Sequence, residues 1–496
     1  MGAEGITSRE EDYSQWYIDI CTRAELADYS PVKGCMVIRP NGFAIWENMR
    51  DALDRMFKET GHKNAYFPLL IPKSFLSKEA EHVEGFAKEC AVVTHHRLMN
   101  SPEGKGVVVD PDARLEEEYI VRPTSETIIW SMYRKWIQSY RDLPLLLNQW
   151  ANVMRWELRT RLFLRTTEFL WQEGHTAHAD YDDAEREARR MIDIYRRFAE
   201  EWMAMPVRMG RKTEREKFAG ALHTYTIEAM MQDGKALQAG TSHHLGQNFA
   251  KAFDVTFQTE TGAREYVHAT SWGVSTRLIG ALIMTHSDDR GLVIPPRIAP
   301  TQVVVVPIAR KAKEKAEVRQ VLDKVTAEWK DGFTYHIDER EGLTPGYKYA
   351  DWELKGVPIR LEIGPRDLKE GHMLAARRDR ERGDEDHKTA LRFEEIPNRI
   401  PRLLNDIQDD LFNKAKARRD ARTYSIESYD ALKNLVEEQP GFYEAWFSED
   451  EEAEKRIKDE LGVTARCIVA SSEEQEGQCF MTGRSTARRV LFARAY

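Results

Sequence analysis

Short blocks of polar and small residues, set in one order along the chain, constrain this sequence more than any other feature. The first block is Arg122-Pro123-Thr124-Ser125-Glu126-Thr127, which follows a run of β-forming residues over 119–121. On an extended strand, residues two positions apart point to the same face. We therefore expect Thr124 and Glu126 to present a hydroxyl and a carboxylate side by side.

Three further blocks follow the first one. They are Asn152-Val153-Met154-Arg155-Trp156-Glu157, Gln238-Ala239-Gly240-Thr241-Ser242-His243-His244 and Ser271-Trp272-Gly273-Val274-Ser275-Thr276-Arg277. Each block alone is a weak signal, because an Arg-x-Glu triplet is usually a surface ion pair and an isolated histidine is usually a core residue. Their shared order and spacing outweigh these simpler interpretations. Arginines suit a site that binds anions, because the planar guanidinium pairs with two oxygens of a phosphate or carboxylate.

Taken together, the blocks resemble the active-site motifs of the class II aminoacyl-tRNA synthetases, and within them those of the prolyl-tRNA synthetase family. This resemblance implies an α+β catalytic domain with the antiparallel class II synthetase sheet over residues 1–296. A small α/β anticodon-binding domain over 297–400 and a small α+β C-terminal domain over 401–496 are expected to follow. The implied activity is the activation of L-proline with ATP to prolyl-adenylate and pyrophosphate, and then the transfer of proline to the 3′ end of tRNA(Pro).

The length of chain between Arg165 and Gln238 indicates the type within the family. It leaves no room for the large editing insertion that bacterial-type members carry there, so the chain resembles the archaeal and eukaryotic type. A proline pocket discriminates weakly against smaller amino acids, because one missing methylene changes binding by only about 1–3 kcal/mol. We therefore expect alanine to be misactivated and then corrected by an editing factor in trans or by an upstream segment.

The resemblance assigns roles to individual residues of the blocks and to their neighbours. Arg155 and Arg277 are the expected catalytic arginines, which would neutralise the proline carboxylate and the phosphates of ATP. The proline pocket is expected to comprise Thr124, Glu126, Arg155, Trp171, Glu173, His175, Phe218, His243 and Ser271. The ATP site is expected to comprise Arg155, Glu157, Arg165, Thr166, Phe169, Gln238, Thr241, Ser275 and Arg277.

The chemistry of the implied substrates explains why such residues are needed. Proline carries a secondary ammonium, and Thr124 and Glu126 would accept its two N–H bonds. The ring needs an apolar slot, for which Trp171 and Phe218 are the expected walls. ATP comes with Mg²⁺, which we expect near Gln238 and mainly on phosphate oxygens, because Mg²⁺ keeps several waters and needs few protein ligands.

A second region of resemblance lies in the expected anticodon-binding domain, over 352–360 and 364–367. The candidates for reading the two adjacent guanines of a prolyl anticodon are Glu353, Arg360, Arg366 and Asp367. Arginine can bond guanine O6 and N7, and carboxylates can accept from guanine N–H groups. The alternative is an edge-strand network of ion pairs. The nearby run 377–382 is mixed in sign, and we expect a solvated loop there.

The C-terminal domain departs from the family pattern. Members of this type usually hold zinc there with four cysteines, but only Cys467 and Cys479 are present, with eleven residues between them. Structural zinc needs four nitrogen or sulfur ligands. We therefore expect no zinc, with aromatic packing that involves Trp446, Phe447 and Phe492 in its place.

Two helices of the catalytic domain are predicted from their apolar spacing. The first spans 41–57, with an apolar residue at every fourth position. It resembles the class II motif that forms the dimer interface, which implies a homodimer. The second spans 182–205, where Asp182 and Glu185 suit a capping box.

Composition narrows the remaining classes of function. A formal net charge of −9 argues against a general nucleic-acid binder, although local basic patches can still hold RNA. Five scattered cysteines indicate a reducing compartment. No stretch is apolar and long enough to cross a bilayer, and residues 1–5 lack a signal-peptide pattern. We therefore expect a cytoplasmic protein without a membrane partner.

Two alternatives to an active prolyl enzyme are open at this point. A catalytically silent paralogue that binds RNA or protein would be expected to have lost Arg155 or Arg277, and both are present. The other alternative is a class II enzyme for threonine, serine or histidine. A threonyl enzyme would need a zinc-binding cysteine in its pocket, for which we find no match. A histidyl enzyme is not expected to carry the arrangement of Thr124 and Glu126.

Overall fold

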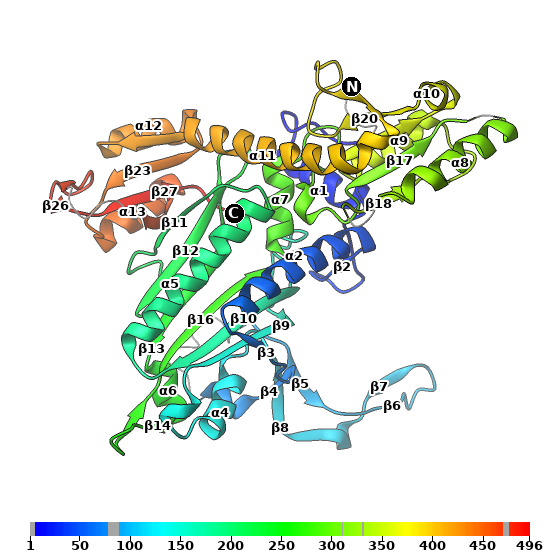
Figure 1. The fold of residues 1–496 in the computed structure, drawn as a ribbon. Helices are drawn as coiled ribbons and strands as arrows, with labels where there is room; N and C mark the ends of the chain where they lie inside the picture. Colours follow the sequence, from blue (N-terminus) through cyan, green and yellow to red (C-terminus); the bar gives the residue numbers. More distant parts are fainter. Residues whose placement is uncertain (1–4, 78–88, 310, 330–331, 470–475) are drawn as a thin grey trace.

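The computed structural model describes residues 5–77, 89–309, 311–329, 332–469 and 476–496. The first four residues, on which the expected lack of a signal peptide partly depends, lie outside these ranges. Figure 1 shows a large region around a long twisted sheet, a smaller region in yellow-green with its own sheet, and a last region in orange and red. The succession of α+β, α/β and α+β regions agrees with the predicted fold class.

The first region is built on an antiparallel sheet. Within the described residues its strands run in the order β11-β12-β13-β16-β10-β9. Their bounds are Val207–Arg211 (β11), His223–Met230 (β12), Ala236–Gly246 (β13), His268–Ser275 (β16), Glu168–His178 (β10) and Leu145–Met154 (β9). Neighbouring strands in this order are all antiparallel, and β3 (Lys63–Asn64) adds to β9 in parallel. The predicted antiparallel sheet is thereby confirmed.

Helices pack against one face of this sheet. α5 (Tyr181–Arg197) runs along β12, β13 and β16 and buries Met191 and Tyr195. α2 (Pro40–Glu59) and α7 (Arg277–His286) belong to the same hydrophobic cluster. α2 corresponds to the first predicted helix and α5 to the second, except that α5 gives way to a π-helical turn, η3, over Phe198–Trp202.

The predicted capping box of α5 is wrong. The N-cap is Asp180, which has an extended backbone and accepts a hydrogen bond from the Asp183 N–H at 2.8 Å. Asp182 lies inside the first turn. The Glu185 carboxylate is taken up by other partners, among them Nδ1 of His244 at 3.2 Å. Tertiary partners on the sheet thus claim the side chain that a capping box would use.

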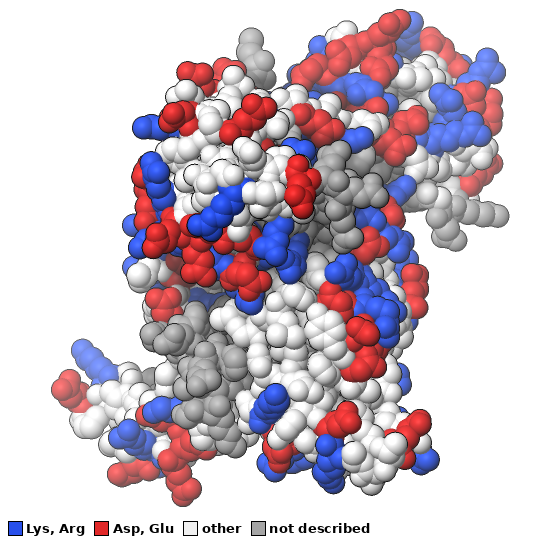
Figure 2. All heavy atoms as spheres, turned by 90° about the vertical axis from the view of Figure 1, so that its left-hand side faces the viewer, with Lys and Arg blue, Asp and Glu red and all other residues white. Residues whose placement is uncertain are grey.

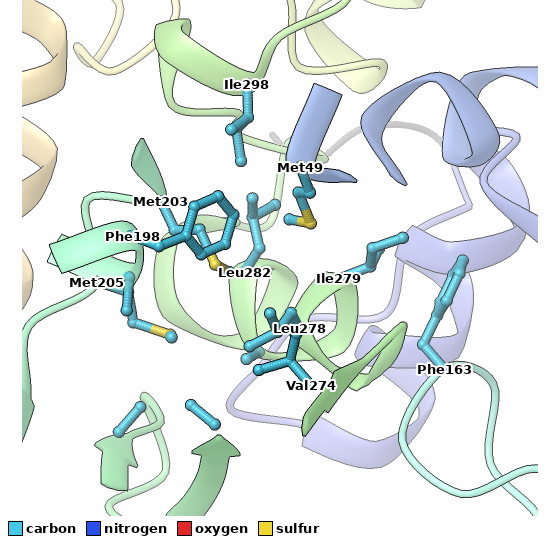
Figure 3. Close-up of a cluster of buried hydrophobic side chains, with 14 of the residues drawn as sticks. Met49, Phe163, Phe198, Met203, Met205, Val274, Leu278, Ile279, Leu282 and Ile298 are labelled. Atoms are coloured by element: carbon cyan, nitrogen blue, oxygen red, sulfur yellow. The ribbon is translucent and has the colours of Figure 1, made fainter. Parts of the chain in front are cut away.

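α7 lies inside the hydrophobic core. Every residue from Leu278 to Thr285 is buried. Figure 3 shows Leu278, Ile279 and Leu282 of this helix within a cluster of apolar side chains from several elements. The other labelled members of the cluster are Met49, Phe163, Phe198, Met203, Met205, Val274 and Ile298. Burying a large apolar side chain stabilises the fold by roughly 1.5–3 kcal/mol, so this packing fixes α7 and the residue that begins it, Arg277.

The second region has a mixed sheet of its own. Its described strands are β17 (Val303–Pro307), β18 (Tyr335–Ile337), β19 (Ile359–Ile363), β20 (His372–Arg377) and β21 (Lys388–Arg392). β17, β18 and β19 are parallel to one another. β20 is antiparallel to β19, and β21 is antiparallel to β20. The helices are α8 (Ala312–Thr326), α9 (Pro345–Leu354) and α10 (Pro365–Glu370). The interior strand β17 is buried on both faces from Val303 to Val306, as its run of valines predicts.

The third region begins with α11 (Ile396–Ala421), which crosses the expected domain boundary at 400. Its further elements are β22 (Thr423–Ile426), α12 (Tyr429–Glu438), β23 (Phe442–Trp446), α13 (Glu451–Leu461), β24 (Thr464–Val469) and β27 (Arg489–Ala493). β24 pairs with β11, so these strands extend the central sheet (Figure 1). The approach is close, because a Cβ on Gly210 would lie 2.2 Å from the carbonyl oxygen of Ile468.

A separate arm projects from the first region, at the lower right of Figure 1. Its strands are β4 (Leu70–Pro72), β5 (Val92–His95), β6 (Leu98–Asn100), β7 (Val107–Val109) and β8 (Arg114–Val121). The last of these strands confirms the β-structure predicted just before the first block. α4 (Glu126–Trp136) follows it after a short loop.

The surface carries charges of both signs. Figure 2 shows Lys and Arg side chains intermingled with Asp and Glu on the face that lies at the left of Figure 1. Among the described residues, no helix combines the length and apolar character needed to cross a bilayer.

Candidate active site

A cavity of about 310 Å³ opens on the central sheet. Most of the predicted site residues line it, although they come from segments between residues 124 and 277. They are Thr124, Glu126, Arg155, Phe169, Trp171, Glu173, His175, Phe218, Gln238, Thr241, His243, Ser271, Ser275 and Arg277. The fold therefore brings the four sequence blocks together at one place.

The register of the strands explains this convergence. His175 on β10 lies opposite Ser271 on β16, Ser271 lies opposite His243 on β13, and His243 lies opposite Thr224 on β12. Cross-strand neighbours point to the same face of a sheet. Gly273, two residues beyond Ser271, also lines the cavity and adds no side chain there. The sheet thus presents a row of polar groups beside an open floor.

Thr124 and Glu126 do not lie on a strand, so this part of the sequence prediction is wrong. β8 ends at Val121, and Glu126 is already the first residue of α4. The backbone of Ser125 has φ −108° and ψ 3°, which turns the chain out of the extended conformation. The two side chains meet nevertheless, because the Thr124 hydroxyl donates to the Glu126 carboxylate. A turn into a helix, rather than the period of a strand, places them together.

Glu173 is the centre of a buried polar network. Its carboxylate accepts from the Ser125 hydroxyl at 2.5 Å, from Nε2 of Gln149 at 2.8 Å and from Nε2 of His175 at 3.0 Å. Burial opposes the charged form of Glu173, but these hydrogen bonds outweigh it and lower its pKa. Burial also opposes a charge on His175, but the bond to Glu173 and the charge of Glu126 raise its pKa. The two groups form a buried hydrogen-bonded pair in which each favours the charged form of the other.

His243 has the opposite electrostatic character. Its Nδ1 lies 3.0 Å from the Thr224 hydroxyl, and its ring centre lies 4.8 Å from that of Phe218. Burial, together with the charges of His175 and Lys212, lowers the pKa of His243 to about 3. The ring is therefore neutral at physiological pH.

The two predicted catalytic arginines are each held by a backbone carbonyl. Nε of Arg155 donates to the Pro123 oxygen at 2.9 Å, and its guanidinium lies 5.2 Å from the ring centre of Trp171. Nε of Arg277 donates to the Leu164 oxygen at 3.1 Å. Burial lowers the pKa of both guanidinium groups, yet such groups keep their charge in proteins. Two fixed positive charges therefore face one cavity.

Three predicted ATP-site residues lie outside the cavity lining. Arg165 and Glu157 are 3.6 Å apart in a partly exposed ion pair between β9 and β10. Thr166 is buried, and its hydroxyl donates to the carbonyl oxygen of Glu168 at 2.7 Å. The structure thus places these residues beside the cavity but does not bring them into it.

Lys212, Glu216 and Thr224 also line the cavity, and the sequence interpretation missed them. Nζ of Lys212 donates to the buried carboxylate of Glu228 at 3.0 Å. A lysine or glutamate in a charged segment carries no distinctive pattern. Thr224 could be assigned only once the register of β12 against His243 is known.

The predicted anticodon-reading residues fall into two groups. Glu353 and Arg360 line one small pocket of about 10 Å³ in the second region. Glu353 pairs there with Arg290 at 2.9 Å and with Arg382 at 2.6 Å. The other two candidates lie outside this pocket. They are Arg366, which is exposed, and Asp367, which accepts from the Gly364 N–H at 2.8 Å in the first turn of α10.

The expected solvated loop over 377–382 is wrong at its first two residues. Arg377 and Arg378 are both buried. Nη2 of Arg378 lies 2.7 Å from Asp288 of the first region, and Nη2 of Arg377 lies 2.7 Å from Asp410 on α11. Carboxylates from the neighbouring regions flank these arginines, which local charge alternation cannot reveal.

In the part of the chain that the structure describes, no cluster of three or more His, Cys, Asp or Glu side chains is arranged to hold a metal ion. Cys467 and Cys479 are both buried. Phe447 and Phe492 pack at 5.4 Å between ring centres, and Phe480 joins them. The absence of zinc from this unit stays a prediction.

Three family models match the chain in succession. Residues 109–286 match "tRNA synthetase class II core domain (G, H, P, S and T)", residues 302–403 match "Anticodon binding domain", and residues 429–496 match "Prolyl-tRNA synthetase, C-terminal".

Several curated proteins are similar over their full length. Proline–tRNA ligase of Porphyromonas gingivalis is 58% identical over 492 residues, which cover 99% of each chain. Proline–tRNA ligase of Bacteroides fragilis is 58% identical over 496 residues, with the same coverage. Proline–tRNA ligase of Cytophaga hutchinsonii is 55% identical over 492 residues, again covering 99% of both chains.

Proposed function

The chain belongs to the prolyl-tRNA synthetases of class II, which join L-proline to tRNA(Pro) through prolyl-adenylate, and we propose that the 310 Å³ cavity is where it does so. The observation that carries this proposal is the meeting of Thr124, Glu126 and two fixed arginines in one cavity. Such a cavity offers both acceptors for an ammonium and cations for phosphates.

We propose that Thr124 and Glu126 hold the secondary ammonium of proline. Its two N–H bonds need two acceptors, and the hydroxyl and carboxylate are already joined by a hydrogen bond. Because His243 is neutral, it would not repel the ammonium. Trp171 and Phe218 would bound the apolar ring. An analogue without the second N–H would leave a buried acceptor unpaired, which costs roughly 1–3 kcal/mol.

We propose that Glu173, His175 and Ser271 complete the pocket without contacting the reacting atoms. The hydrogen-bonded pair of Glu173 and His175 would fix the wall of β10 beside Glu126. Ser271, opposite His175 in the sheet, would close the floor.

Arg155 and Arg277 would carry the activation step. An oxygen of the proline carboxylate attacks the α-phosphorus of ATP, the bond to pyrophosphate breaks, and prolyl-adenylate forms. Both reactants are anions, so two preorganised guanidinium groups lower the barrier by stabilising charge that builds up at the phosphorus. Arg155 would lie between carboxylate and α-phosphate, and Arg277 would bind the outer phosphates.

The remaining cavity residues suit the nucleotide. Phe169 would stack on the adenine of ATP, while Gln238, Thr241 and Ser275 would contact the ribose and phosphates of the nucleotide. Gln238 and Thr241 present oxygen donors, which fit Mg²⁺. When Mg²⁺ is bound, it would neutralise part of the negative charge of the phosphates. Glu157, Arg165 and Thr166 stay part of the proposal as groups that border the cavity.

We propose that Glu353 and Arg360 read the anticodon. Glu353 is held on one side by the largely buried Arg290, whereas its second partner, Arg382, is exposed. A guanine edge would displace Arg382 and use the freed carboxylate oxygen. Arg366 and Asp367, on α10, would contribute from outside the small pocket.

The remaining proposals concern assembly and location. We propose a cytoplasmic homodimer with α2 at its interface, a division into domains at residues 296 and 400, and correction of alanine errors by a factor in trans. The resemblance of α2 to the family's dimer motif supports the homodimer. The scattered free cysteines support the cytoplasmic location. α11 would serve as the connecting helix between the last two domains.

One assay tests the proposal. ATP–pyrophosphate exchange is measured with each amino acid in turn, with the parent enzyme and with Arg277→Ala. Strong exchange with proline and loss of at least two orders of magnitude in the variant are expected, as for other removed transition-state charges. Exchange that prefers another amino acid, or that survives in the variant, would contradict the proposal.

A further inference from the structure

The C-terminal unit contacts the wall of the catalytic cavity directly. Segment 212–218 supplies three cavity-lining residues, and its polar groups bond to α13 and the residues before it. The Thr213 hydroxyl donates to Glu454 at 3.1 Å, and Nη1 of Arg215 donates to the Glu451 carbonyl oxygen at 3.1 Å. The third region therefore holds part of the wall in place.

A deeper contact lies beneath this segment. Glu228 on β12 is fully buried and accepts from Nζ of Lys212 at 3.0 Å and from the Thr226 hydroxyl at 2.9 Å. Its second oxygen accepts both Nε and Nη2 of Arg466, at 3.0 and 2.8 Å. Arg466 lies on β24, 238 residues further along the chain. A residue of the C-terminal unit thus completes a polar group of the catalytic sheet.

The charges of this cluster do not cancel. One carboxylate faces two cations, so Lys212, Glu228 and Arg466 together carry one net positive charge. Burial opposes ionisation of Glu228, but the charges of Lys212 and Arg466 lower its pKa and keep it ionised. The same cluster acts on the cavity, because Arg466 and Glu228 both influence the pKa of the Arg277 guanidinium.

Removing Arg466 would change how strongly Lys212 is bound by Glu228. Glu228 would keep a single cation as partner, and Lys212 would be drawn fully into a neutral pair. A buried carboxylate without enough partners is strongly destabilising, so this redistribution is favoured. The cavity wall would then lose one positive charge beside the place where phosphates gather.

We propose that Arg466 is a positioning residue for amino-acid activation: by binding one oxygen of Glu228, it leaves the Lys212 ammonium available at the cavity wall to the anionic triphosphate of ATP. This inference rests on the proposed use of the cavity for proline and ATP. It makes the C-terminal unit part of the activation machinery rather than a separate module.

The test compares Arg466→Gln with Glu228→Gln and with the double variant in proline-dependent ATP–pyrophosphate exchange. Active sites are counted by the burst of prolyl-adenylate, so that misfolded enzyme does not affect the rate constants. For Arg466→Gln we expect KM for ATP to rise about tenfold while KM for proline changes less than about twofold. In the double variant Glu228 no longer needs a partner, so KM for ATP is expected to recover to within about threefold of the parent.

Arg208→Gln is the matched control. Arg208 also crosses from the catalytic sheet to the C-terminal unit, where it pairs with Glu444, but it lies outside the cavity lining. We expect its KM for ATP to equal that of the parent enzyme. If Arg466→Gln does not fold, Arg466→Lys, which keeps the charge but loses the fork, should show a smaller rise of the same KM.

The outcomes distinguish a failure of the proposed function from a failure of the role proposed for Arg466. A parent enzyme without proline-dependent exchange would overturn the proposed function itself. A normal parent together with an Arg466→Gln variant that behaves like Arg208→Gln, or a double variant no better than the single one, would overturn only the role of Arg466.

Discussion

The hydroxyl of Ser125 donates to the carboxylate of Glu173 at 2.5 Å, across 48 residues of sequence. The bond ties the loop that carries Thr124 and Glu126 to strand β10, which carries the wall of the pocket. Ser125 itself is fully buried. A residue that need not touch substrate therefore sets the distance between the two halves of the proposed proline pocket.

Replacing Ser125 by alanine should weaken proline binding. Glu173 would lose a donor while it stays buried, at a cost of roughly 1–3 kcal/mol, and the loop would lose its anchor. We expect KM for proline to rise about tenfold with KM for ATP nearly unchanged, measured by pyrophosphate exchange. Ser131→Ala is the control, because Ser131 bonds only within α4, to the Ile128 oxygen. Equal kinetics of the two variants would contradict this role of Ser125.

Thr124→Val tests the ammonium site itself. Valine keeps the volume of threonine but cannot accept an N–H bond, so a polar group of bound proline would go unsatisfied. We expect KM for proline to rise by about one to two orders of magnitude, with KM for ATP within about twofold. Thr127→Val serves as the control, since Thr127 is buried nearby but outside the cavity lining. Unchanged proline affinity in Thr124→Val would remove Thr124 from the pocket.

Glu454 gives the protein a stability that depends on pH. Burial raises the pKa of this carboxyl, which bonds to Thr213, from 4.5 to about 7. The unfolded chain releases the proton near pH 4.5 and the folded chain near pH 7. Between these values the folded state binds more protons, so stability falls as pH rises.

Glu454→Gln removes this dependence. The amide keeps an oxygen acceptor for Thr213 and carries no charge. At pH 8 we expect the variant to be more stable than the parent by roughly 2–4 kcal/mol, and at pH 4.5 the difference should nearly vanish. Urea unfolding at both pH values measures this, with Glu452→Gln on the exposed face of the same helix as the control. A stability difference that does not depend on pH would contradict the buried ionisation.

Glu353→Gln should act on tRNA rather than on activation. The amide cannot accept two guanine N–H bonds and loses its ion pairs with Arg290 and Arg382. We expect KM for tRNA(Pro) to rise about tenfold or more in aminoacylation, which corresponds to roughly 1–3 kcal/mol for a specific base contact. Aminoacylation with an unchanged KM for tRNA would assign Glu353 to the domain interface alone.

The sequence predicts the parts of this site that lie within one short block. Arg155, His243 and Arg277 all line the cavity, where Arg155 directly follows β9, His243 lies on β13 and Arg277 begins α7. The conformation around Thr124 was harder to predict. The side chains of Thr124 and Glu126 can meet either on an extended strand or at a turn into a helix. The backbone conformation of Ser125 decides between these two possibilities.

Contacts between regions could not be predicted. Arg466 and Glu228 are 238 residues apart, and Arg378 and Asp288 are 90 apart. Each is an ordinary charged residue in its own segment. Their pairing depends on how the second and third regions dock on the first, and a single sequence carries no local pattern for that.

The pairing of β24 with β11 also bears on how the chain can be shortened. An unpaired strand at the border of a sheet exposes N–H and C=O groups that recruit strands of other molecules. A protein cut before residue 464 would lack β24 and leave β11 unpaired at the border of the sheet. It would also lack the apolar packing that the third region supplies there. Such a fragment should aggregate on purification, even though Arg155 and Arg277 would still be present in it.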